Sequence, residues 1–264
     1  MRVNVVVCGT VLSTLTSSLL TLPRCCFDTH IEERLSLYSK TFMSRTALTL
    51  ISATPSAYAR MNYIALSLKG IPFKVHNEIP WHSTTITPRY NPLEQLPILL
   101  FPDNRPPIYQ SAHIQNYIVE KYADRSPSLL PGGIDDNLLA KQIVALSVGS
   151  LDALVLFGWE TRRKQEQQNE MWKSRQIRKV SGAIKAYNAY VEAAGGKPHV
   201  LGDELTIADI GIVCALEAYK FTQVEADWEE TYPTLAKYYA GLDKLRIFQE
   251  TKPVMFNMND DEVV

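Results

Sequence analysis

Cysteine is scarce in the main part of this 264-residue chain. Cys8, Cys25 and Cys26 lie near the start, and only Cys214 lies in the remainder. A single cysteine cannot form an internal disulfide, and no Cys or His pair has the spacing of a metal site. Cys214 stands in an apolar run, which predicts a buried thiol that packs as a small hydrophobe. The sequence therefore predicts a protein of a reducing compartment with no metal site.

The chain also lacks an excess of either charge, with 27 Lys and Arg against 28 Asp and Glu. A nucleic-acid partner normally requires a clearly basic domain, so none is expected. With 46% hydrophobic and 21% charged residues, the composition excludes disordered, collagen-like and disulfide-scaffold proteins. The length allows one large domain or two modest ones.

A long uninterrupted apolar run is missing as well. Residues 3–22 are apolar but contain seven Ser and Thr, whereas a membrane-spanning helix needs about 20 mostly apolar residues. No small-x-small cleavage site follows, so a secretory signal is disfavoured. We interpret residues 1–42 as an extension that is either disordered or precedes a true start at Met43. We expect a cytoplasmic protein without integral membrane association, with secretory or organellar targeting by residues 1–24 as the alternative.

The first part of the remaining chain has the pattern of a small α/β domain. We expect strands at residues 47–52, 73–79, 97–101 and 108–109, and helices at 56–69 and 111–121. The first strand, helix and second strand form a βαβ unit, whose two strands should be parallel. Turn residues at 102–106 indicate a hairpin between the last two strands. The pattern predicts a four-stranded mixed sheet with helices on both sides.

The second part is helical, after a loop rich in Pro and Gly. Helices are expected at residues 138–166, 171–194 and 234–249, and one further helix begins at Thr206. Thr206 and Asp209 have the spacing of a capping box, in which each side chain bonds to the other's backbone amide. Residues 257–264 form an acidic tail.

Three segments of the chain resemble motifs of the glutathione S-transferase superfamily. They are SATPSAYAR (Ser52–Arg60), NPLEQLPIL (Asn91–Leu99, similar to NP-x-x-x-[VL]-P-x-L) and YQSAHIQNYI (Tyr109–Ile118, similar to [ED]-S-x-x-I-x-x-Y-[IL]). Their order and spacing extend the resemblance over residues 47–252. It is nearest to fungal glutathione S-transferase-like proteins, some of which are linked to specialised-metabolite pathways.

The resemblance implies a fold of class α/β plus all-α. A thioredoxin-like glutathione-binding domain (43–123) would be joined by a linker (124–136) to a helical glutathione-transferase domain (137–256). The family further implies a homodimer that uses glutathione as substrate or cosubstrate and needs no metal.

Ser56 occupies the position where the family keeps a catalytic Ser or Cys. A hydroxyl that donates to the glutathione thiolate contributes about 1.5–3 kcal/mol, and the helix N-terminus adds about 0.3–1 kcal/mol. Ser56 is equally a good N-cap, which is a purely structural alternative. Ser52 and Thr54 are competing hydroxyls in the same loop, and Ala57 replaces a proline common among relatives.

The other two motifs would hold the glutathione peptide. By resemblance, a cis Pro97 turns the Leu96 backbone outward to pair with the cysteinyl unit. Gln110 and Ser111 would bind the γ-glutamyl end at a helix N-terminus, with the Ser111 hydroxyl and amide donating. Gln110 replaces a more usual acidic residue.

The resemblance implies an enzyme of detoxification or secondary metabolism that acts on a small hydrophobic electrophile by conjugation, elimination or isomerisation. Tyr58, Phe157 and Trp159 are candidates for the acceptor pocket, although the two helical-domain aromatics could equally be helix core. The alternative is a non-catalytic module of the same fold that binds ligands or protein partners.

Overall fold

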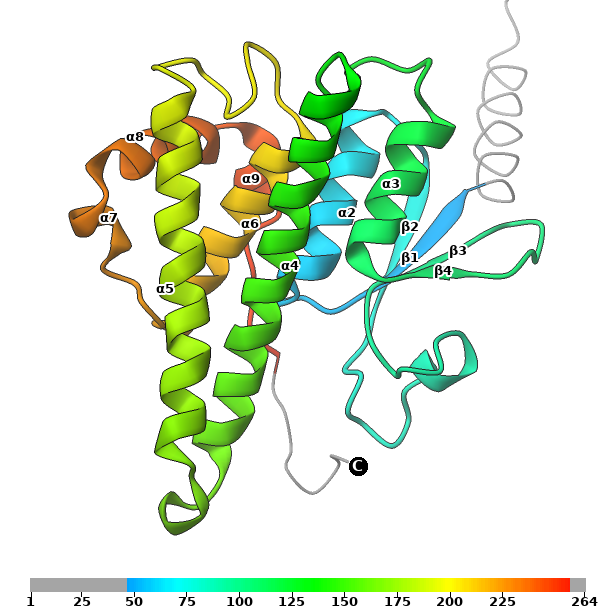
Figure 1. Cartoon of the computed structure of the whole chain (residues 1–264). Coiled ribbons are helices and arrows are strands. Elements are labelled where there is room, and N and C mark those ends of the chain that lie inside the picture. The colour runs from blue at the N-terminus through cyan, green and yellow to red at the C-terminus, as the bar shows by residue number, and fades with distance from the viewer. Residues whose placement is uncertain (1–46, 257–264) are drawn as a thin grey trace, which may run out of the picture. The chain divides into compact units, whose positions relative to one another are not determined.

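The computed structural model describes residues 47–256 of the chain. The predicted N-terminal extension and acidic tail lie outside the described residues. The strands are β1 (Leu48–Ser52), β2 (Phe73–Asn77), β3 (Ile98–Leu100) and β4 (Ile108–Tyr109). The helices are α2 (Ala57–Leu68), η1 (Thr87–Arg89), α3 (Ser111–Lys121), α4 (Ile134–Arg162), η2 (Gln165–Gln167), α5 (Glu170–Ala193), α6 (Ile207–Thr222), α7 (Trp228–Thr231), α8 (Pro233–Asp243) and α9 (Arg246–Glu250) (Figure 1).

The four strands form one mixed sheet with the order β2-β1-β3-β4. β1 and β2 are parallel, and β3 is antiparallel to both β1 and β4. The predicted sheet is therefore confirmed. Helices α2 and α3 pack against each other and against β1 and β3, so they cover one face together. The expectation of helices on both sides is wrong, because the chain between β2 and β3 forms only the short η1 within the described residues.

Helix α6 is the centre of the helical part. Every residue from Ile207 to Tyr219 is buried, because α6 packs against α4 and α8 within its own domain and against α2 of the α/β domain. Helix α4 has the length and apolar composition of a membrane-spanning helix. However, 44% of its most apolar 18-residue stretch is buried inside the protein. It contacts α5 and α6 along its length, as a core helix does (Figure 1).

The helix boundaries differ from the prediction at both ends of α4 and within the helix expected at 234–249. Helix α4 ends at Arg162 and not at residue 166, and the short α7 was not predicted. Helix α4 begins at Ile134, inside the expected linker. Gly133, the N-cap residue, adopts a φ of 101° that suits glycine, and the acidic residues Asp135 and Asp136 in the first turn interact favourably with the helix dipole. The helix expected at 234–249 is divided into α8 and α9, since Leu245 adopts an extended conformation. This break turns α9 back onto α2. The thiol of Cys214 is buried as predicted, and burial raises its pKa to about 11.

Candidate functional site

Ser56 stands at the beginning of α2, where the loop after β1 ends. It is the N-cap residue, and its Oγ accepts a hydrogen bond from the Ala59 amide at 3.2 Å. Because the oxygen acts as acceptor there, the hydroxyl proton remains available for a ligand. The side chain is half-buried and therefore accessible from one side. Its capping role is confirmed, and this geometry is compatible with a second role as a donor.

The two competing hydroxyls of the loop are placed less favourably. Ser52 is buried, and its Oγ lies 3.5 Å from the Ala53 carbonyl oxygen, to which it donates. Thr54 is exposed, and its carbonyl accepts from the Val254 amide at 3.3 Å. Neither hydroxyl lies at the helix N-terminus, so Ser56 is the one that benefits from the helix dipole.

The Leu96-Pro97 peptide bond is cis, as the resemblance implied. Ile98 pairs with Ile51 of β1 and with Tyr109 of β4. Leu96 precedes this pairing by two residues, so continued registers would bring it near the β1–α2 loop on one side and the start of α3 on the other. In the described part of the chain, no backbone hydrogen bond engages the Leu96 amide or carbonyl. This backbone is thus open to pair with an extended peptide.

Gln110 makes the turn from β4 into α3. Its φ of 72° lies in the left-handed region, which non-glycine residues rarely adopt. Its exposed side chain donates from Nε2 to Oε1 of Gln95 at 3.4 Å. The first amides of α3 have no helical acceptor, since a helix leaves its first four N–H groups unpaired. The turn therefore presents amide donors and two glutamine side chains at one place.

The Ser111 hydroxyl is used inside the protein. It donates to the Tyr58 backbone carbonyl at 2.8 Å and accepts from Nδ2 of the Asn62 side chain at 3.0 Å. The residue is only 2% exposed. In this structure the hydroxyl ties α3 to α2, so its expected contact with the ligand stays a prediction. The Ser111 amide, at the first position of α3, is the donor available there.

Tyr58 joins the two domains. Its hydroxyl on α2 donates to Oδ1 of Asp152 on α4 at 2.7 Å. Burial, and then the neighbouring Asp152 charge, raise the pKa of the Tyr58 phenol far above its ordinary value. The group therefore stays protonated at any physiological pH. It is a neutral donor between the domains, and its place in an acceptor pocket remains a prediction.

Trp159 belongs to a group of aromatic rings drawn from three segments. Its ring lies 5.0 Å from that of Trp81, which follows β2, at an angle of 87°. Trp81 also contacts Phe256 at 6.2 Å. We call Trp81, Trp159 and Phe256 the aromatic cluster. Trp159 and Phe157 are both partly buried, so a place in an acceptor pocket and the alternative of helix packing both remain predictions.

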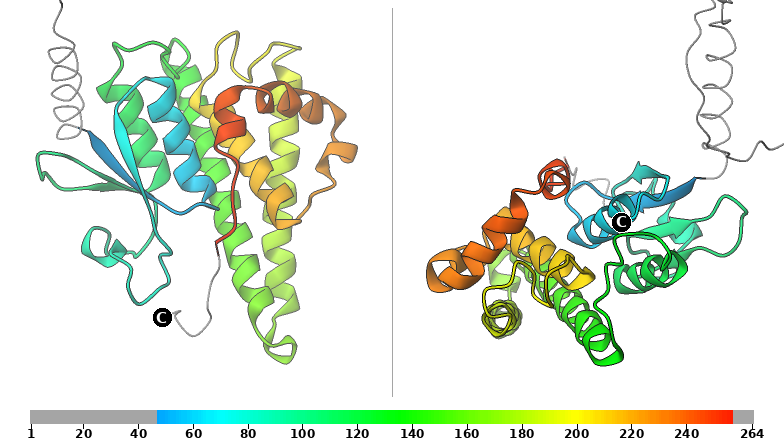
Figure 2. Two further views of the ribbon diagram at one scale, coloured as in Figure 1. Left: turned by 180° about the vertical axis from the view of Figure 1, so that it is seen from behind. Right: turned by 90° about the horizontal axis from the view of Figure 1, so that it is seen from above.

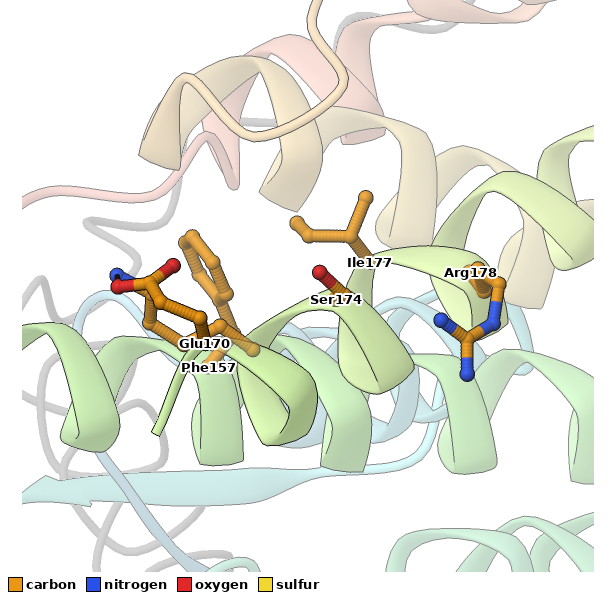
Figure 3. A pocket seen from close by; sticks show the side chains of 6 residues that line it. Phe157, Glu170, Ser174, Ile177 and Arg178 are labelled. Carbon is orange, nitrogen blue, oxygen red and sulfur yellow. Dashed lines mark ion pairs between the residues drawn. The ribbon is translucent and has the colours of Figure 1, made fainter. Parts of the chain in front are cut away.

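A separate hollow lies where the end of α4 meets the beginning of α5 (Figure 3). It has a volume of about 360 Å³ and is lined by Phe157, Glu170, Lys173, Ser174, Ile177 and Arg178. None of the β1–α2 loop, Leu96 or Ser111 lines it, so this hollow is distinct from the candidate glutathione site. Among residues 47–256, no three His, Cys, Asp or Glu side chains are placed to hold a metal ion.

Sequence reasoning missed several residues of this region. Gln95 adjoins Leu96 within the second motif, which is a signal that could have identified it. Trp81, Phe256 and Asp152 carried no comparable signal, because their partners are distant in sequence. Asn62 lies on α2, six positions after Ser56. It was missed because its partner Ser111 is 49 residues away in the sequence.

Comparisons with known proteins identify the family of the two domains. Residues 55–121 match the family model of the glutathione S-transferase N-terminal domain, and residues 170–241 match that of its C-terminal domain. The chain is 28% identical over 204 residues to the GST-like protein YibF of Escherichia coli, covering 77% of this chain and 98% of YibF.

Solved structures give the same result. A glutathione S-transferase of Methylobacterium radiotolerans in complex with glutathione sulfonate has a TM-score of 0.75 and 34% identity, over 81% of this chain and 99% of that one. A glutathione S-transferase of Methylobacillus flagellatus with bound glutathione has a TM-score of 0.72 and 25% identity, over 79% and 100%. The chain, with its mixed sheet followed by a helical domain, therefore belongs to the glutathione S-transferase family.

Proposed function

We propose that this protein binds glutathione and activates its thiol for conjugation to, or elimination or isomerisation of, a hydrophobic electrophile. The observation that carries the proposal is the convergence of the Ser56 helix start, the open Leu96 backbone and the α3 N-terminus. The two related structures bound to glutathione or its sulfonate support glutathione as the ligand.

Activation of the thiol is assigned to Ser56. A thiol of pKa about 8.5 must be shifted by about 2 units to be a thiolate at neutral pH, which requires roughly 2.7 kcal/mol. The Ser56 hydroxyl can donate to the thiolate while its oxygen keeps the Ala59 amide bond. Together with the helix N-terminus, this donor supplies about 2–4 kcal/mol. No general base is needed.

The glutathione peptide is held at two further places. The Leu96 amide and carbonyl pair with the cysteinyl unit in the manner of an added strand. The γ-glutamyl carboxylate binds at the start of α3, where the Ser111 amide donates and Gln110 lies beside it. For the Ser111 hydroxyl to join, it must exchange the Tyr58 carbonyl for the carboxylate.

The electrophile is placed between the domains. Tyr58 and Trp159 flank this region from α2 and α4. Phe157 lies two residues before Trp159 on α4 and lines the separate hollow against α5, so its contact with the acceptor is the least supported part of the proposal. Apolar and aromatic walls favour a hydrophobic acceptor. A cytoplasmic homodimer is part of the proposal, and its solution mass would test the dimer. We also propose that the acceptor is a compound of detoxification or of secondary metabolism, and that the protein is most similar to the fungal glutathione S-transferase-like proteins.

The test compares Ser56→Gly with Asn169→Gly. Both changes replace an N-cap by glycine, since the Asn169 side chain caps α5 through the Trp172 amide at 3.0 Å, and each should cost only a few tenths of a kcal/mol. Ser56→Gly should raise the pKa of bound glutathione by about one to two units, whereas Asn169→Gly should leave it unchanged. The ultraviolet thiolate band titrated against pH gives this pKa, and turnover of a chloronitrobenzene gives the activity.

Other outcomes would redirect the proposal. If Ser52→Ala or Thr54→Ala produces the shift instead, that hydroxyl is the activating group. If the wild-type protein is retained on immobilised glutathione but turns over no electrophile, the chain is a non-catalytic binding module. Failure to bind glutathione at all would refute the proposal.

A further inference from the structure

The last described segment of the chain runs from the helical domain to the loop that carries Ser56. Figure 2 shows it in red, passing beside the connection from β1 to α2. We call residues 251–256 the strap. At its far end, the Val254 amide donates to the Thr54 carbonyl at 3.3 Å, and the Phe256 ring contacts Trp81 at 6.2 Å.

Arg60 fastens the near end of the strap. This residue of α2 is only 6% exposed, and its amide donates to the Ser56 carbonyl at 3.0 Å. Its guanidinium donates to the Phe248 carbonyl at 2.8 Å and to Oγ1 of Thr251 at 3.2 Å. Within residues 47–256 it forms no ion pair with a carboxylate. Within these residues, the side-chain hydrogen bonds of this buried cation are therefore directed at the end of α9 and the first residue of the strap.

Lys252 fixes the direction in which the strap leaves α9. Its ammonium pairs with Asp243 at 3.2 Å and with Glu217 at 3.6 Å. With Arg60 bonded to Thr251 and these carboxylates paired with Lys252, the base of the strap is held at two neighbouring residues. The remaining residues are thereby directed toward Thr54 and the aromatic cluster.

We infer that the strap is a wall of the acceptor site, in which Phe256 is a specificity-determining residue and Arg60 is its positioning residue. This inference rests on the proposed function of the same site. The rings of the aromatic cluster meet at 87° and 63°, so they present both faces and edges. Such surfaces favour a flat aromatic acceptor over an aliphatic one, because aromatic pairs gain energy beyond their buried area.

The first experiment measures the acceptor preference of Phe256→Ala. The KM for a chloronitrobenzene should rise about tenfold, while that for a small alkyl halide should change less than twofold. Glutathione affinity and the pKa of its bound thiol should stay as in the wild type. Phe256→Tyr, which retains the ring, should restore the aromatic preference. Equal losses for both acceptors would overturn the inference.

The second experiment tests the coupling between Arg60 and the strap. Arg60→Met should raise the KM for the aromatic acceptor as a chain truncated after Lys252 does, and combining the two changes should add nothing. A chain truncated after Phe256 and the variant Arg246→Met are controls, the latter removing an exposed cation of the neighbouring α9. Additive effects would show that Arg60 acts elsewhere and would overturn its assigned role.

A third measurement separates this inference from the proposed function. Quenching of tryptophan fluorescence by a planar aromatic ligand requires no turnover, and Trp81 and Trp159 are two of the four tryptophans that contribute to it. A protein in which Trp172 and Trp228 are replaced by Phe restricts the signal to these two. Phe256→Ala should weaken that binding about tenfold, even if the protein proves not to be a transferase. Unchanged binding would overturn the inference while leaving glutathione activation untouched.

Discussion

Helices α2 and α6 both begin at a hydroxyl residue, Ser56 and Thr206, but they differ in how many hydrogen-bonding positions of the capping side chains are left open to a ligand. At α6, the Asp209 carboxylate accepts from the amides of Val200 and Thr206, from the Thr206 hydroxyl and from the Tyr238 hydroxyl, at 2.6–2.9 Å. At α2, Ser56 receives one bond, from the Ala59 amide, and is half-buried.

The difference separates a structural cap from a functional one. Asp209 is fully buried and has its acceptor positions filled, so it can only hold the helix in place. Within residues 47–256, the Ser56 hydroxyl proton is not donated in a hydrogen bond, and one side of the side chain is accessible to a ligand. The first α6 turn should therefore govern stability, whereas the first turns of α2 and α3 should govern ligand chemistry.

The largest expected effect is on stability, from Asp209→Ala. The change removes a cap and leaves several buried donors without an acceptor, each of which costs about 1–3 kcal/mol. We expect a loss of about 3–5 kcal/mol in the free energy of unfolding, measured by urea denaturation. Asp203→Ala, an exposed acidic residue of the same connection, is the control and should stay within about 0.5 kcal/mol. A loss below about 1 kcal/mol for Asp209→Ala would contradict this assignment.

A smaller effect is expected from acid. Burial alone raises the pKa of Asp209, but the nearby His199 imidazole, at 3.7 Å, and hydrogen bonds from the Tyr238 hydroxyl and two backbone amides outweigh it and lower the pKa below its ordinary 3.8. The contribution of the carboxylate to stability is thus complete above pH 3.8 and is lost as the pH falls through the lower, folded-state value. Urea midpoints measured from about pH 6 to pH 2 should fall less steeply in Asp209→Asn. An identical slope in both proteins would exclude Asp209 as a source of acid sensitivity.

The smallest effect is expected at the start of α3. When glutathione binds, the Ser111 hydroxyl exchanges a neutral bond to Tyr58, about 0.5–1.5 kcal/mol, for a bond to a carboxylate, about 1.5–3 kcal/mol. Ser111→Ala should therefore weaken glutathione affinity by about 1 kcal/mol, or about fivefold, in calorimetric titration. The pKa of the bound thiol should not change, in contrast to Ser56→Gly. Unchanged affinity would show that the hydroxyl keeps its bond to Tyr58.

Local signals were sufficient for the four strands and for the starts of α2, α3, α5, α6 and α8, but not for those of α4, α7 and α9. The capping box at Thr206–Asp209 is present, and the sheet has the predicted mixed topology. The resemblance added the cis Pro97, which spacing alone would not predict, because X-Pro bonds are mostly trans. The division of the 234–249 helix at Leu245 was missed, since no Gly or Pro marks it.

The sequence by itself determined where most of the long helices begin and that the chain joins an α/β domain to a helical one, because caps and periodicity act between near neighbours. Only the tertiary structure decided that the Ser111 hydroxyl bonds to Tyr58, that Tyr58 reaches Asp152, and that Arg60 holds Thr251. These bonds join residues 53, 94 and 191 positions apart. Their geometry depends on how α2 packs against α3, α4 and α9, and no local pattern encodes that packing.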